Sequence, residues 1–279
     1  MGGVITSTAN PQVKAIVRLQ KRSERDATGL FVVEGAREAG RAVAAGIAVD
    51  TLVVAPDLVP RGGADAVRAA RATGARVLEV SPSVFGRISG RTGPDGVALV
   101  ARRPATALAA LALGPTPLVL VAAAIEKPGN LGAMLRSAAA AGADALVLAD
   151  PVTDVFNPNA VRASMGALFT VPVGVGTTAE VVAWAHERGL RLVVTSPAAT
   201  TAHWDAPLAE PTAVVIGSEA NGVEDAWFRA ADERVTVPMA DHDGVDSLNA
   251  SATAAVVLFE AVRQRAGGAH EGAGPGDGQ

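Results

Sequence analysis

The sequence of 279 residues contains no cysteine. This absence excludes disulfide bonds, thiolate metal sites and cysteine nucleophiles, and it is typical of a protein in the reducing cytoplasm. Histidine is scarce as well, and the four that are present do not have the spacing of metal ligands. We therefore predict a cytoplasmic protein that holds no metal ion.

Long apolar runs are also missing, although 49% of the residues are hydrophobic. No run approaches the ~20 residues that a membrane-spanning helix needs. The N-terminus lacks a basic stretch followed by an apolar one, so no secretory signal is predicted. The length indicates about two domains at ~150 residues each.

Charge is distributed unevenly along the chain. Residues 1–104 hold 15 Lys and Arg against 9 Asp and Glu, which gives a net charge of +6. Residues 105–279 hold 9 against 19, which gives a net charge of −10. A polyanion such as RNA would be attracted to the N-terminal part and repelled by most of the remainder.

Helical and extended patterns alternate in residues 1–104, which predicts a small α/β domain. Pro11 stands at a favourable first position for a helix over 11–22. Further helices are predicted over 36–45 and 63–73, and strands over 30–35, 51–55, 76–80 and 96–101. Residues 105–117 carry two prolines and directly follow a third, Pro104, and they are predicted to be a linker with room for a short helix.

From Leu118 onward the predicted strands are fully apolar, as suits parallel strands covered on both faces. They span 118–124, 145–149, 190–196, 213–218 and 234–239. Helical patterns separate them and a last helix is predicted over 247–265, so we predict a parallel-sheet α/β domain over 118–265. Residues 266–279 contain six glycines and a proline and are predicted to be a disordered tail.

Three short blocks in this second half place Gly, Asn, Ser and charged residues directly after apolar runs. They are EKPGNLGAMLRSA (126–138), VVIGSEANG (214–222) and PMADHDGVDSLNASATAA (238–255). In an open α/β sheet, ligands bind beyond the carboxyl ends of the strands, where such blocks would lie. Asn130 is a candidate helix cap, and the Gly-x-Glu-x-x-Gly of the second block predicts a tight turn.

Taken together and in this order, the blocks resemble the three motifs of the SpoU (TrmH-like) family of RNA ribose 2′-O-methyltransferases. The resemblance implies a C-terminal domain with the deep trefoil knot of SPOUT-type enzymes, S-adenosylmethionine as the cofactor, and a homodimer formed through the knotted domain. It also implies that residues 1–104 are a ribosomal-protein-like domain that binds structured RNA, with 23S rRNA as the expected substrate.

The resemblance also implies roles for individual residues. Catalysis is assigned to Asn130, Arg136, Glu219 and Asn249. Cofactor binding is assigned to Thr195, Ser196, Ile216, Gly217, Ser218, Gly222, Val237, Pro238, Met239, Ser247, Leu248, Asn249, Ser251 and Ala252. RNA contacts are expected from Lys14, Arg18, Lys21, Arg22, Arg25, Arg37, Arg136, Arg162 and Ser164.

Two of these assignments leave alternatives open on physical grounds. The basic residues between Lys14 and Arg25 recur at spacings of three and four, which predicts one basic stripe along a helix, or else an ordinary solvated helix face. Arginine normally keeps its charge. Arg136 is therefore either a general base that first loses its proton or a phosphate clamp that sets the ribose hydroxyl in line.

Three functions other than 23S rRNA methylation remain as alternatives for this sequence. A tRNA ribose methyltransferase would carry the same blocks, and the sequence does not separate a housekeeping modification from an antibiotic-resistance one. A nucleotide-binding oxidoreductase would be expected to carry Gly-x-Gly-x-x-Gly where this chain has EKPGNLG. A non-catalytic RNA-binding module would not need Asn130, Arg136, Glu219 and Asn249 together.

Overall fold

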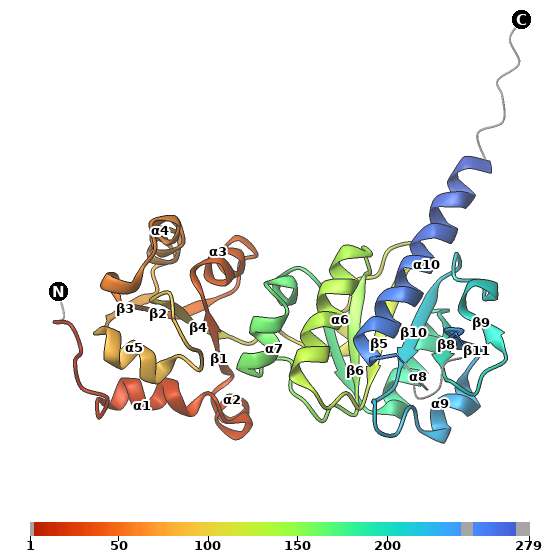
Figure 1. Cartoon of the computed structure of the whole chain (residues 1–279), viewed down its shortest axis with the longest axis horizontal. Coiled ribbons are helices and arrows are strands. Elements are labelled where there is room, and N and C mark those ends of the chain that lie inside the picture. The colour runs from red at the N-terminus through yellow and green to blue at the C-terminus, as the bar shows by residue number, and fades with distance from the viewer. Residues whose placement is uncertain (1–2, 241–247, 272–279) are drawn as a thin grey trace, which may run out of the picture. The chain divides into compact units, whose positions relative to one another are not determined.

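The structure of the chain is a computed structural model that describes residues 3–240 and 248–271, the side chains of 268–271 excepted (Figure 1). The chain forms two compact units. The N-terminal unit consists of Met1–Ala105 and Asp154–Thr170, and the C-terminal unit of Thr106–Thr153 and Val171–Gln279. The N-terminal unit therefore includes a segment that we had predicted as part of the domain over 118–265.

A four-stranded mixed sheet forms the centre of the N-terminal unit, in the order β1-β4-β2-β3. Its strands are β1 (Leu30–Glu34), β2 (Val49–Val54), β3 (Arg76–Glu79) and β4 (Val97–Arg102). Both β1 and β2 run antiparallel to β4, and β3 runs parallel to β2. The helices of this unit are α1 (Pro11–Arg18), α2 (Arg22–Thr28), α3 (Ala36–Ala44), α4 (Ala64–Ala72) and α5 (Pro82–Ile88), with the short 3-10 turns η1 (Pro56–Leu58) and η2 (Arg61–Gly63).

The predicted helix over 11–22 is shorter in the structure, and a second helix follows it. The Asn10 side chain caps α1 by accepting from the backbone N–H of Gln12, and Pro11 occupies the first helical position. This helix ends at Arg18, and α2 begins only at Arg22. The five basic residues between Lys14 and Arg25 therefore do not form one stripe on one helix.

Arg25 differs most from its prediction as an RNA contact, because its side chain is only 1% exposed. Its Nε donates to the carboxylate of Asp154 at 2.7 Å, and one terminal nitrogen donates to the carbonyls of Leu19 and Gln20. Arg25 thus ties the α1–α2 turn to the segment that begins at Asp154. A guanidinium that is buried and bonded in this way cannot contact a phosphate, so this prediction was wrong.

Seven parallel strands form the sheet of the C-terminal unit in the described residues, in the order β7-β6-β5-β10-β8-β11-β9. They are β5 (Leu118–Ala123), β6 (Ala145–Ala149), β7 (Val173–Gly176), β8 (Arg191–Thr195), β9 (Thr201–Ala202), β10 (Thr212–Ile216) and β11 (Glu233–Thr236). The predicted parallel α/β fold is confirmed. The two strands that the sequence did not predict are β7, which contains two glycines, and β9, which has two residues, so neither presents an apolar run.

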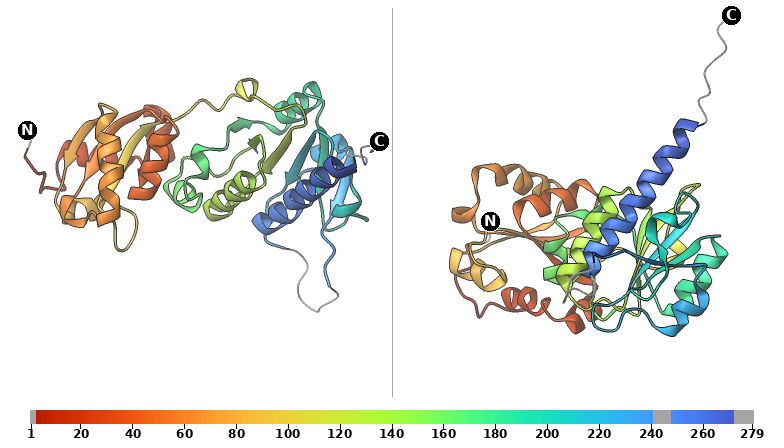
Figure 2. Two further views of the ribbon diagram at one scale, coloured as in Figure 1. Left: turned by 90° about the horizontal axis from the view of Figure 1, so that it is seen from above. Right: turned by 45° about the vertical axis from the view of Figure 1, so that its right-hand side comes forward.

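Helices cover both faces of this sheet (Figure 2). On one face α6 (Pro128–Ala140) packs against α10 (Ala250–Glu271), and on the other lie α8 (Thr178–Glu187) and α9 (Asp225–Ala230). Trp184 of α8 and Trp227 of α9 are buried with Val119 and Val121 of β5 in one core cluster. None of the described helices is long and apolar enough to cross a membrane.

Two further segments, the predicted linker and the predicted tail, differ from the predictions. The predicted linker packs as part of the C-terminal unit, where η3 (Leu108–Ala110) precedes Leu111, a member of its core cluster. The last helix, α10, extends to Glu271, so residues 266–271 are helical and not disordered; the remaining predicted tail lies outside the described residues.

The segment Asp154–Thr170 lies between β6 and β7 in sequence and contains α7 (Pro158–Ala163) and the turn η4 (Ala167–Phe169). Its Phe156 ring lies 5.0 Å from that of Phe31 in β1, and the Arg103 guanidinium lies 5.0 Å from the same Phe156 ring. Such apolar and cation–π contacts, together with the Arg25–Asp154 pair, anchor the segment in the N-terminal unit.

Candidate active site

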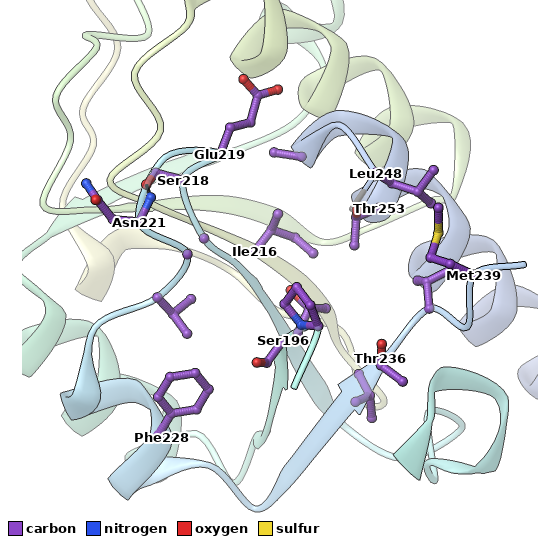
Figure 3. A pocket seen from close by; sticks show the side chains of 18 residues that line it. Ser196, Ile216, Ser218, Glu219, Asn221, Phe228, Thr236, Met239, Leu248 and Thr253 are labelled. Atoms are coloured by element: carbon purple, nitrogen blue, oxygen red, sulfur yellow. Dashed lines mark hydrogen bonds between the residues drawn. The ribbon is translucent and has the colours of Figure 1, made fainter. Parts of the chain in front are cut away.

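A cavity of about 530 Å³ lies at the carboxyl ends of β8, β10 and β11, where an open parallel sheet binds ligands (Figure 3). Figure 3 shows its side chains arranged around the end of β10, with Phe228 on one side and Met239 and Leu248 on the other. The cavity is lined by Thr195, Ser196, Pro197, Ile216, Gly217, Ser218, Glu219, Asn221, Gly222, Val223, Phe228, Val235, Thr236, Val237, Met239, Leu248, Ala250 and Thr253.

The wall of this cavity beside β10 is the tight loop 217–222. The backbones of Ser218 and Gly222 exchange two hydrogen bonds of 2.9 Å, and Gly222 has a φ of +65°, which favours glycine. A Cβ on Gly217 would lie 2.2 Å from the backbone carbon of Gly222. The predicted tight turn is present, and the atoms nearest to Gly217 belong to Gly222 and Val223 of this turn.

Most of the predicted cofactor residues line the cavity, but five are not among its lining residues. Pro238, Asn249, Ser251 and Ala252 do not line it, and Ser247 lies outside the described residues. Sequence reasoning missed Pro197, Asn221, Val223, Phe228, Val235, Thr236, Ala250 and Thr253. Asn221 and Val223 flank Gly222, a predicted cofactor residue, so the second sequence block could have identified them. Phe228 comes from α9, and no local pattern singles it out.

At the edge of this cavity, polar side chains from all three sequence blocks meet. The Asn130 amide donates to the Glu219 carboxylate at 2.7 Å, and the Asn249 amide donates to the same carboxylate and to the Asn130 side-chain oxygen, the latter at 3.2 Å. Lys127 completes the cluster through an ion pair with Glu219. The structure thus brings together three of the four predicted catalytic residues.

Neighbouring groups fix the two amides in place. Asn130 was a candidate helix cap, but α6 begins at Pro128, so Asn130 lies within the first turn and its side chain is available to Glu219. The Asn249 side-chain oxygen accepts hydrogen bonds from the Ser251 backbone N–H at 3.0 Å and from its hydroxyl at 2.6 Å. This leaves the Asn249 amide to donate into the cluster.

The hydrogen bonds from Lys127, and after it Asn130, lower the pKa of Glu219 below the ordinary carboxyl value, against a smaller opposing effect of burial. The lowered pKa favours the carboxylate form of Glu219, which accepts hydrogen bonds from the surrounding donors. A second cavity of about 290 Å³ adjoins the cluster and is lined by Ile125, Glu126, Lys127, Asn130, Glu219 and Ala220. Glu219 is the lining residue that both cavities share.

Comparison with known proteins agrees with this geometry. Residues 117–259 match the SpoU rRNA methylase family. The chain belongs to this family. Residues 10–99 match the MRM3-like substrate binding domain, which falls within the N-terminal unit.

Relatives of this SpoU-family chain cover nearly its whole length. A 23S rRNA (uridine(2479)-2′-O)-methyltransferase of Streptomyces viridochromogenes is 32% identical over 90% of this chain and 88% of its own. The 23S rRNA (guanosine(2553)-2′-O)-methyltransferase RlmP of Bacillus subtilis is 29% identical over 91% and 97%. The crystal structure of an AdoMet-bound rRNA methyltransferase from Sinorhizobium meliloti has a TM-score of 0.85 at 29% identity and covers 94% of this chain and 97% of its own.

Arg136, the fourth predicted catalytic residue of this SpoU-family chain, stays outside the cluster. It lies on α6 six residues after Asn130, which on a helix of ~3.6 residues per turn places the two side chains about 120° apart around the helix axis. Arg136 is exposed, and it makes no hydrogen bond or ion pair with the described residues. It lines neither of the two cavities.

Several of the predicted RNA contacts are exposed on the N-terminal unit. Lys14, Arg18, Lys21 and Arg22 lie on or between α1 and α2, where Arg18 pairs with Glu24 at 3.7 Å and Arg22 with Asp26 at 3.6 Å.

Two further predicted contacts also bond within the protein: Arg37 bonds to Glu38, and Arg162 lies 3.6 Å from Glu34 and bonds to Asn159. Ser164 is fully buried and donates its hydroxyl to the Val161 carbonyl, so the expectation that Ser164 faces RNA was wrong. Among the residues that the structure describes, no three His, Asp or Glu side chains are grouped as metal ligands would be.

Proposed function

We propose that this chain transfers a methyl group from S-adenosylmethionine to a ribose 2′-hydroxyl in 23S rRNA. The observation that carries the proposal is the convergence of Asn130, Glu219 and Asn249, from three distant motifs, at the edge of a cavity at the strand ends. The names of the two relatives, both 23S rRNA 2′-O-methyltransferases, support the reaction and the substrate.

The lining of the larger cavity fits S-adenosylmethionine. A cavity of about 530 Å³ is within the usual ~300–1,000 Å³ range for small-molecule sites. Ile216, Phe228 and Leu248 offer apolar surface to an adenine, and Ser196 and Thr195 offer hydroxyls. When bound, the cofactor supplies an electrophilic methyl group on a sulfonium. The neighbouring Glu219 carboxylate adds a negative charge that favours a cationic ligand.

The chain's own residues would hold and orient the RNA acceptor. The Asn130 amide donates one hydrogen to Glu219 and has a second for a ribose oxygen, while Asn249 donates to Glu219 and to the Asn130 side-chain oxygen and so keeps both aligned. Arginine has five N–H donors and no acceptor, which favours the phosphate clamp over the general base for Arg136. Much of the rate would then come from fixing the hydroxyl in line.

We further propose that the C-terminal unit forms a homodimer, in which each site draws on Arg136 of the other chain. Arg136 is not used within its own chain's cluster. On the adjoining helix, α10, Phe259 is 48% exposed and Val256 is 36% exposed, and a dimer would bury these apolar side chains.

The proposal includes the deep trefoil knot and a cytoplasmic location. The insertion of β10 between β5 and β8, and the return of α10 onto α6, support the knot. The cytoplasm follows from the proposed substrate, because bacterial ribosomes are assembled there. RNA binding by the N-terminal unit is supported by its match to a substrate binding domain and by the exposed Lys14, Arg18, Lys21 and Arg22.

The test is methyl transfer from labelled S-adenosylmethionine to 23S rRNA fragments, with the product mapped as a 2′-O-methyl group. Asn130→Ala and Arg136→Ala should each lower transfer ~100-fold or more and leave cofactor affinity within a few-fold, the pattern of contacts made mainly in the transition state. Isothermal titration with S-adenosylmethionine and with NAD measures that affinity. Binding of NAD alone, or methyl transfer only to tRNA, would contradict the proposal.

A further inference from the structure

The smaller cavity is next to the proposed cofactor cavity and has a different character. Four of its six lining residues have polar side chains, among them two acidic ones, Glu126 and Glu219, and the amide of Asn130. The two cavities meet at Glu219. If the methyl donor occupies the larger cavity, the smaller one offers a place for the acceptor ribose beside it, because the two cavities adjoin at Glu219.

This position is unfavourable for RNA unless a cation is present. Each ribose is flanked by phosphates, and the two acidic side chains would repel them. Residues 105–279 also carry a net charge of −10. Among the residues that line the smaller cavity, Lys127 is the single cation.

The placement of Lys127 suits a ligand that arrives from solvent. Its side chain is 68% exposed, whereas the carboxylate with which it pairs is 24% exposed. It stands immediately before Pro128, the first residue of α6, where the helix dipole adds partial positive charge. An ammonium group has three donors, so it can retain Glu219 and bond to a phosphate oxygen at the same time.

We propose that Lys127 is a substrate-positioning residue that holds a phosphate of the target nucleotide in the smaller cavity. This inference rests on the proposed function, since it concerns the acceptor of that reaction. In the absence of RNA, Lys127 is paired with Glu219; with RNA bound, it bridges Glu219 and the phosphate. The ribose next to that phosphate then lies against the amide of Asn130.

The first test compares Lys127→Met and Lys127→Arg with the unchanged protein in the methyl-transfer assay. Lys127→Met should raise KM for RNA about tenfold, the loss of one charge-assisted hydrogen bond, and leave kcat and cofactor affinity within a few-fold. The salt dependence of kcat/KM should flatten by about 0.7 in slope. Lys127→Arg keeps the charge and should retain most of the RNA affinity.

The matched control is Arg188→Met, which removes an exposed cation that follows α8 and lines neither cavity. It should leave KM unchanged. If Lys127→Met lowers kcat with KM unchanged, or if Arg188→Met has the same effect as Lys127→Met, the inference is wrong. Absence of methyl transfer by the unchanged protein would instead refute the proposed function itself.

A second test distinguishes phosphate binding by Lys127 from an indirect role in which Lys127 only positions the Glu219 carboxylate. In a Glu219→Gln background the ion pair is gone, and the affinity for an RNA fragment is measured by direct binding so that slow turnover does not matter. Adding Lys127→Met should still weaken binding several-fold and flatten its salt dependence. An identical affinity with and without Lys127 in that background would show that the lysine merely places Glu219.

Discussion

Replacing Arg25 by methionine tests the largest disagreement between the sequence and the structure. As a phosphate contact, Arg25 would contribute little to stability, because surface substitutions usually change it by less than about 0.5 kcal/mol. In the structure its side chain is 1% exposed and that of Asp154 is 7% exposed, with the two joined at 2.7 Å. Removing one partner of such a buried pair typically costs about 3–5 kcal/mol.

The cost arises from what methionine leaves behind. The Asp154 carboxylate would stay buried with the Phe156 backbone N–H as its remaining donor, at 2.8 Å. The carbonyls of Leu19 and Gln20 would each lose a donor that now lies at 2.8 Å and 2.9 Å. Since domains are stable by about 5–15 kcal/mol, a loss of about 4 kcal/mol would unfold an appreciable fraction of the N-terminal unit on mild heating.

The assay is urea and thermal unfolding of the full chain, followed by circular dichroism. Arg25→Met alone should be strongly destabilised, and Arg25→Met combined with Asp154→Leu should recover at least half of the loss, because a buried ion pair can be exchanged for apolar groups at little cost. Arg22→Met is the control on the exposed surface and should change stability little. Were Arg25→Met to cost less than about 1 kcal/mol while flattening the salt dependence of RNA binding, the buried role would be refuted.

Three further outcomes are expected. Gly217→Ala should weaken S-adenosylmethionine binding at least tenfold in isothermal titration, because the added Cβ would lie 2.3 Å from the Gly222 carbonyl oxygen. The control is Gly267→Ala in α10, where an added Cβ would have nothing within 4 Å and the variant should bind the cofactor normally. Equal affinities of the two variants would contradict this account of the loop. The Glu219 carboxylate should stabilise the fold, and this effect is measured as the difference in thermal unfolding between the unchanged protein and Glu219→Gln. The difference should be complete above the ordinary carboxyl pKa of 4.5 and should fade only as pH falls through the lower pKa of Glu219 in the folded protein. A difference that already fades near neutral pH would contradict the lowered pKa of Glu219. Phe259→Glu should shift the proposed dimer toward monomer in sedimentation without loss of helix content, and an unchanged mass would remove this face from the interface.

Because Asp154–Thr170 belongs to the N-terminal unit, deleting residues 1–104 alone would remove only part of that unit. Deleting residues 1–104 would take away Phe31 and Arg25, which pack against Phe156 and Asp154. A buried carboxylate and an aromatic ring would then face water. The truncated protein should fold only if Asp154–Thr170 is replaced by a short polar loop, and its RNA affinity should then fall.

Local patterns in the sequence predicted the features that depend on neighbouring residues. The apolar runs identified five strands of the C-terminal sheet, because a strand covered on both faces must be apolar along its length. Asn10 and Pro11 likewise predicted the start of α1. The resemblance of the three blocks to one family's motifs implied that Asn130, Glu219 and Asn249 share a site, which agrees with their places after apolar runs, because the carboxyl ends of parallel strands share one edge of a sheet.

The tertiary structure alone decided which charges are buried and which atoms become neighbours. Arg25 has the same local spacing as the exposed Arg18 and Lys21, and what distinguishes it is Asp154, which is 129 residues away. Lys127 joins the cluster only because the loop that carries Glu219, 92 residues later, returns to the start of α6. A side chain's charge is written in the sequence, but its desolvation and its partners depend on segments that meet only when the sheet has formed.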